Sequence, residues 1–128
     1  MTNSLRTPLS RARGLGSAKS GVGHFIQQRA SAMFLAVLLP WFGLSVILGT
    51  DGSFTSVTSW MSHPFNAAGT LLLVLTGVFH MRLGLQTVIE DYIHKPMTRT
   101  ICMLVNTAIP AILAIVAALS VAKLYVVA

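Results

Sequence analysis

Three long apolar runs, at residues 30–49, 67–89 and 101–127, constrain the fold of this chain more than any other feature. A helix that crosses the hydrocarbon core of a bilayer needs about 20 predominantly apolar residues, and each run is long enough. Hydrophobic residues make up 54% of the sequence and charged residues only 9%, whereas soluble domains carry about 25% charged residues. The sequence therefore predicts an all-α membrane protein with three transmembrane helices and excludes a water-soluble fold.

The three predicted spans use most of the 128 residues. We therefore expect a single membrane-anchored domain, residues 1–128, of which residues 1–28 form a basic tail. The first apolar run begins near residue 30 and is too long for the short core of a cleaved signal peptide, so we expect it to remain as a span. Three helices are too few to enclose a large cofactor, which indicates a partner subunit.

Basic residues are distributed unevenly and predict the topology. Residues 50–66 contain no Lys or Arg, whereas residues 93–100 contain Lys95 and Arg99. Because Lys and Arg concentrate in cytoplasmic segments, we expect the N-terminal tail and the second loop to be cytoplasmic. An Arg-rich, Ser-rich tail without acidic residues is also typical of a mitochondrial transit peptide, an interpretation that we rank second. The cations near this end of the chain are Arg6, Arg11, Arg13, Lys19 and Arg29.

The net charge of +6 gathers mostly in this tail. Attraction to anionic lipid explains it better than nucleic-acid binding does. Residues 14–21 superficially resemble a phosphate-binding loop, but Ala18 precedes the lysine where the motif requires glycine, and no strand comes before it. Cys102 is the single cysteine, which excludes an intrachain disulfide and a cysteine-based metal site.

His80 lies inside the second apolar run, and no charged residue precedes it within that run. An ionisable group within a membrane span is read first as a functional residue. On a helix, Gly84 is rotated by about 40° from His80, and Asp91 by about 20° at about 16 Å further along, so all three share one face. An imidazole at this depth is a natural ligand for a metal or haem iron, and Gly84 leaves room for a flat macrocycle. The alternative is a neutral histidine hydrogen-bonded to a neighbouring helix.

The roles of three further residues remain open at this stage. His24 and Arg29 stand at the predicted cytoplasmic mouth of the first helix, where they would meet haem propionates or extend their polar ends to the interface. Arg82 is rotated by about 200° from His80 on the helical wheel. It would face a propionate, a partner subunit or the interface.

Two stretches carry a resemblance to a known family. One is residues 21–32, which end in Arg-Ala-Ser-Ala, and the other is His80, three residues, Gly84, six residues, and Asp91-Tyr92. Together with three spans and a basic tail, these motifs resemble the small hydrophobic membrane-anchor subunit of succinate dehydrogenase, respiratory complex II, of the bacterial D type. The resemblance covers nearly the whole chain, and the second motif is the more specific.

The resemblance implies specific roles. His80 would be one axial ligand of a b-type haem, with the second histidine supplied by a companion anchor subunit. Arg29, and also His24, would lie near the propionates, although many family members carry an acidic residue where His24 stands. Tyr92 would donate a hydrogen bond to a carbonyl oxygen of ubiquinone, and Asp91 would orient that site or assist proton delivery.

The same resemblance implies a subunit that is not catalytic alone. It would anchor the flavoprotein and iron–sulfur subunits to the bacterial inner membrane, with the mitochondrial inner membrane ranked second. It would also ligate haem b with a second cytochrome b-type anchor and share a ubiquinone site. Two alternatives stay open: the anchor of a fumarate reductase, and a non-redox helical membrane module in which His80 relays protons.

Overall fold

The computed structural model describes residues 7–9 and 21–127 of the chain. Three long helices dominate it: α2 (Gly21–Gly49), α4 (Pro64–Tyr92) and α5 (Pro96–Val127). Each is long and apolar enough to cross a membrane, which confirms the all-helical fold with three candidate spans. The following parts of the predicted tail lie outside the described residues: Arg6, Arg11, Arg13, Lys19 and residues 14–20 of the segment that resembles a phosphate loop.

The helices extend beyond the apolar runs from which they were predicted. Helix α2 begins at Gly21, so residues 21–28 of the predicted tail are helical. The reason is that hydropathy marks the part of a helix suited to lipid, whereas backbone hydrogen bonds continue into the polar residues at its ends. Pro40 and Pro110 lie within continuous helices, as membrane helices tolerate when neighbours satisfy the freed backbone groups.

A short helix, α3 (Phe54–Ser62), occupies the connection between the first two spans. Hydropathy did not predict it, because nine residues are too few to form an apolar run as long as a membrane span. Its start follows local chemistry: Ser53 is the N-cap, and its side chain accepts a hydrogen bond from the Ser56 backbone N–H at 3.2 Å. Asp51 accepts from the Ser53 backbone N–H at 2.8 Å and also from the Ser56 hydroxyl. A serine before an apolar segment is the signal that marks such a helix start.

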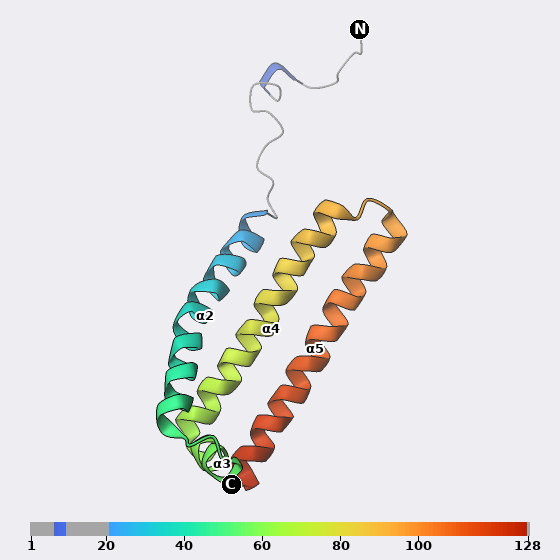
Figure 1. Ribbon diagram of the computed structural model, residues 1–128. Helices are drawn as coiled ribbons and strands as arrows, with labels where there is room; N and C mark the ends of the chain where they lie inside the picture. Colours follow the sequence, from blue (N-terminus) through green and yellow to red (C-terminus); the bar gives the residue numbers. More distant parts are fainter. Residues whose placement is uncertain (1–6, 10–20, 128) are drawn as a thin grey trace.

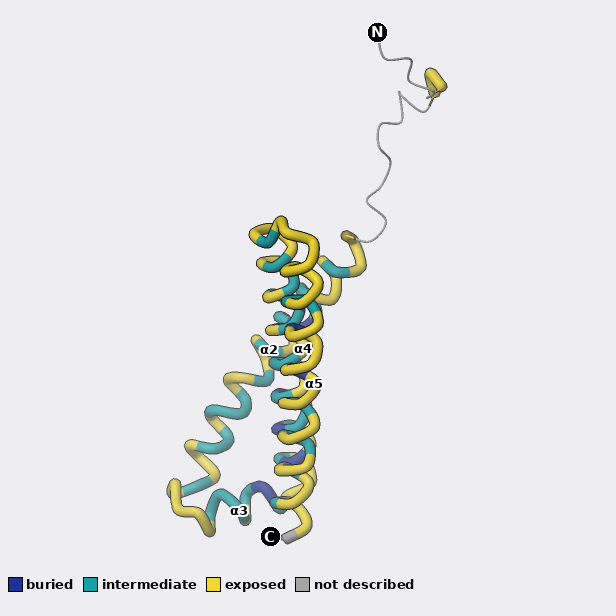
Figure 2. The backbone as a smooth tube through the Cα atoms, turned by 90° about the vertical axis from the view of Figure 1, so that its right-hand side faces the viewer, coloured by how far each residue is buried: buried dark blue, intermediate teal, exposed yellow. Residues whose placement is uncertain are grey.

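Helix α4 is central, because it packs against α2 on one side and α5 on the other. Within the described part of the chain, α2 and α5 do not pack against each other. Figure 1 shows the N-terminal end of α2, the C-terminal end of α4 and the start of α5 at the same end of the molecule. In Figure 2 the C-terminal half of α2 leaves the layer of α4 and α5, and α3 crosses the space beneath it. Part of α4 stays exposed between its neighbours, as at Leu72 and Leu85.

The described part of the chain buries polar as well as apolar side chains and exposes large apolar ones, unlike a soluble protein. Large apolar residues on the helices are exposed, as at Leu48, which is 82% exposed. Such a surface suits lipid or a partner helix. Among the few buried residues three are polar, and polar contacts between membrane helices hold them together. These three are Ser31, Thr70 and Asn106.

Candidate functional site

His80 lies at the contact between α4 and α2. Its Nδ1 is 2.9 Å from the hydroxyl oxygen of Ser31 on α2, 49 residues away in the chain. The Ser31 hydroxyl also donates to the backbone carbonyl of Gln28 at 3.0 Å. Ser31 is only 5% exposed, so this bond is sheltered. Among the described residues His80 Nε2 has no hydrogen-bond partner.

Polar side chains extend this contact along α2. His24, Gln28 and Ser31 are separated by four and three residues, which places them on one face of the helix. His24 Nε2 and Gln28 Oε1 are buried without a hydrogen-bond partner in the described structure. Buried polar atoms are nearly always paired in a complete structure. The unpaired atoms therefore point to a polar group that the described residues do not supply.

Gly84 on α4 faces the row of polar side chains on α2. A Cβ atom built on Gly84 would meet Gln28 Nε2 at 3.7 Å, an ordinary contact distance. Gly84 therefore faces the Gln28 side of α2, at the same contact between α2 and α4 as His80, and these two residues share the face of α4 that their spacing predicted. Sequence reasoning did not single out Gln28 and gave Ser31 no role at a site. The available signal was the spacing of polar residues on an otherwise apolar helix.

Arg29 does not join this row. It precedes Ser31 by two residues, which turns it about 160° away around α2. Its guanidinium lies over the ring of Phe25, 5.3 Å from the centroid, and the residue is exposed. It lies at the same end of the bundle as His24, but on a different face.

Asp91 and Tyr92 end α4 and are exposed, Tyr92 by 78%. The helix is continuous from His80 to Tyr92, so the pair lies about 16–18 Å along the axis from His80. No described residue forms a hydrogen bond or ion pair with either side chain. The structure therefore keeps the His80 site and the Asp91-Tyr92 pair apart.

Arg82, whose role the sequence left open, lies on the side of α4 that faces α5. It lines a cavity of about 230 Å³ between these helices. Its backbone carbonyl accepts a hydrogen bond at 3.0 Å from the side-chain Nδ2 of Asn106 on α5. Arg82 is therefore turned away from the His80–Ser31 contact.

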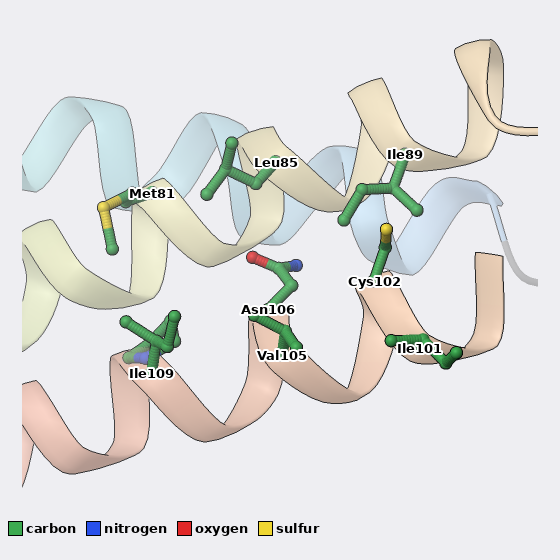
Figure 3. Close-up of a pocket in the computed structure, with 9 residues that line it drawn as sticks. Met81, Leu85, Ile89, Ile101, Cys102, Val105, Asn106 and Ile109 are labelled. Carbon is green, nitrogen blue, oxygen red and sulfur yellow. The ribbon is translucent and has the colours of Figure 1, made fainter. Parts of the chain in front are cut away.

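A second groove, of about 290 Å³, also runs between α4 and α5 (Figure 3). Its lining is almost wholly apolar, apart from Asn106, whose Oδ1 is buried and unpaired within the described residues. Cys102, a free thiol, contributes to the same wall. In the described part of the chain no group of three or more His, Cys, Asp or Glu side chains is placed to hold a metal ion.

Known proteins similar to this chain point to one family. The family described as succinate dehydrogenase/fumarate reductase transmembrane subunit matches residues 3–122. The succinate dehydrogenase hydrophobic membrane anchor subunit of Rickettsia bellii (strain RML369-C) is 37% identical over 94 residues, which cover 73% of this chain and 74% of the relative. The subunit of the same description from Rickettsia conorii is 31% identical over 122 residues, 93% of this chain and 97% of the relative. That from Paracoccus denitrificans is 36% identical over 86 residues, 67% of each chain. No solved structure matches the chain.

The fold and the site define a class: a multi-pass membrane protein of three long helices with a histidine held between two of them. The similarity over residues 3–122 narrows that class. The chain belongs to the succinate dehydrogenase/fumarate reductase transmembrane subunit family, and it is a membrane anchor subunit of succinate dehydrogenase.

Proposed function

We propose that this chain is the D-type anchor of its complex, that it supplies one axial ligand to haem b, and that it shares a ubiquinone site with its partners. The observation that carries the proposal is the held imidazole of His80, whose Nδ1 contacts Ser31 and whose Nε2 has no partner in the described residues. A companion cytochrome b-type anchor would supply the second histidine ligand of this haem. The flavoprotein and iron–sulfur subunits carry the succinate chemistry.

The residues around His80 fit a haem. Gly84 has no side chain on the face of α4 that carries His80. The buried atoms His24 Nε2 and Gln28 Oε1 have no hydrogen-bond partner among the described residues and are free to bind a polar group. His24 stands at the N-terminal end of the row of polar side chains on α2, where a hydrogen-bonding side chain suits a propionate. Arg29 lies on another face of the same end of α2, and its assignment to a propionate rests on the family resemblance. When bound, haem exchanges single electrons, and the protein tunes its potential through the axial ligand and the hydrogen bonds behind it.

Quinone binding is assigned to the other end of this face. The Tyr92 hydroxyl donates a hydrogen bond to a quinone carbonyl oxygen and stabilises the negative charge that develops there during reduction. The adjacent Asp91 carboxylate orients this group or passes a proton to it. Both side chains are exposed, as a site completed by other subunits requires.

The charge distribution supports an orientation with the N-terminus in the cytoplasm. The start of α2 and the end of α4 lie at the same end of the bundle (Figure 1). A cytoplasmic N-terminus therefore brings Asp91 and Tyr92 to the cytoplasmic surface of a bacterial inner membrane. Soluble subunits bound at that surface would deliver electrons there.

The haem assignment is tested by replacing His80 with Ala in the purified complex. The low-spin bis-histidine spectrum is expected to disappear, while succinate oxidation with an artificial acceptor survives. His63→Ala is the matched control, because His63 is exposed in the connection before α4 and its loss should leave the spectrum unchanged. A native complex without a Soret band would instead refute the haem assignment and leave the anchoring role unaffected.

The quinone assignment is tested by Tyr92→Phe, which keeps the ring and removes one donor. Succinate–quinone reductase activity should fall by about 10- to 1000-fold, with no change in the haem spectrum. Tyr125→Phe is the control, since it changes the other tyrosine of the chain, near the C-terminal end of α5. Wild-type activity and quinone affinity in Tyr92→Phe would refute the assignment. Asp91→Asn should shift the pH dependence if the carboxylate carries protons, and lower the rate uniformly if it orients Tyr92.

A further inference from the structure

The hydrogen bonds of Ser31 favour one of the two neutral forms of the His80 ring. A serine hydroxyl has one proton to donate and lone pairs with which to accept. The Gln28 backbone carbonyl, 3.0 Å away, can only accept, and a Ser31 proton donated to it leaves the Ser31 oxygen to accept from His80. The contact of 2.9 Å with His80 Nδ1 is then a bond in which His80 Nδ1–H donates to Ser31.

A neutral imidazole carries one ring proton. If that proton is on Nδ1, the lone pair is on Nε2, the nitrogen that has no hydrogen-bond partner among the described residues. A metal-ligating histidine requires this division, with one nitrogen free to bind and the other donating to a neighbouring oxygen that fixes the ring. The hydroxyl of Ser31 meets the second requirement.

We propose that Ser31 is a positioning residue, which holds His80 with Nδ1 protonated and Nε2 directed to the haem iron. The inference rests on the proposed function, in which His80 ligates haem. It goes beyond that function by assigning control of the ligand's protonation and orientation to α2, a different helix from the one that carries the ligand.

The location of Ser31 supports this role. It is 5% exposed, so water competes poorly for the bond. The backbone of α2 orients the hydroxyl, because its other partner is the carbonyl three residues earlier. The direction of the imidazole is therefore coupled to the packing of α2 against α4.

The bond also affects the iron. Donation from Nδ1–H to an oxygen raises the basicity of the imidazole, which favours the ferric over the ferrous state. Its removal should raise the haem midpoint potential. We expect a change of about threefold to tenfold in the ratio of ferrous to ferric haem at a fixed potential, and the tenfold limit corresponds to about 59 mV for a one-electron couple.

The test compares three variants in the assembled complex. Ser31→Ala removes the acceptor, Ser31→Thr keeps a hydroxyl, and Ser45→Ala is the matched control. Ser45 lies on the same helix, and its hydroxyl oxygen is also buried but has no partner in the described structure. Redox titration of the haem and its ferric electron paramagnetic resonance spectrum are the measurements.

A raised potential and changed g values are expected in Ser31→Ala, with values near wild type in Ser31→Thr and Ser45→Ala. If Ser31→Ala does not assemble, Ser31→Val replaces it, because valine and threonine have the same shape and differ by the hydroxyl. Equal potentials and spectra with and without the hydroxyl would overturn the role of Ser31. A normal low-spin spectrum in His80→Ala would instead overturn the proposed haem ligand, so the two failures are distinct.

Discussion

Gly69 on α4 provides a quantitative test of the packing that joins α2 to α4. The indole of Trp41 on α2 lies directly over this glycine. A Cβ atom at position 69 would be 2.6 Å from Trp41 Cζ3 and closer still to Cη2, whereas carbon atoms in contact are separated by about 3.5–4.0 Å. Gly69→Ala therefore forces the indole to move by about 1 Å.

The cost of this movement has three parts. Overpacking of a close contact destabilises by about 1–3 kcal/mol. Trp41 also packs edge-to-face on Phe65, with ring centroids 5.6 Å apart and an interplanar angle of 88°, and such a pair contributes about 0.5–1.5 kcal/mol. Alanine regains about 0.5–1 kcal/mol over glycine inside a helix. The expected net loss is about 2 kcal/mol, or about 30-fold in the ratio of folded to unfolded chain.

The measurement is an unfolding titration of the purified complex with a denaturing detergent in mixed micelles. Gly43→Ala is the matched control, because Gly43 lies on α2 and a Cβ there meets nothing within 4 Å. It should be neutral or slightly stabilising. If Gly69→Ala is as stable as Gly43→Ala, then Trp41 does not pack closely on α4, and the reasoning is wrong.

Two other predictions concern polar contacts. Hydrogen bonds from the Ser53 side chain, the Ser56 side chain and the Ser53 backbone lower the pKa of Asp51 from 3.8 to about 2. The contribution of Asp51 to the stability of the start of α3 is therefore complete above pH 4 and is lost as the pH falls toward 2. NMR titration of carbon-13-labelled aspartate should find the low pKa of Asp51 in the wild type and a higher one in Ser56→Ala. Asn106→Ala removes the bond to the Arg82 carbonyl and should cost about 0.6–1.7 kcal/mol in the same detergent titration; a stability equal to wild type would mean that this bond contributes nothing.

Sequence reasoning predicted the spans because lipid imposes a length and an apolar character on any helix that crosses it. It missed α3, because a nine-residue helix between spans follows local capping rather than hydropathy. The roles of haem and quinone residues stay predictions, since they depend on groups that other subunits bring to His80 and Tyr92.

The sequence by itself determined the separation of His80 from Asp91 and Tyr92, because residues on one continuous helix are spaced by its fixed rise and rotation. It also determined which residues of α2 share a face. Only the tertiary structure decided that α4 lies between α2 and α5, that Arg82 faces α5, and that Ser31 meets His80. The physical reason is that helix neighbours and their rotation depend on the fit of side chains across the whole contact, such as Trp41 over Gly69, and no short segment of sequence contains that fit.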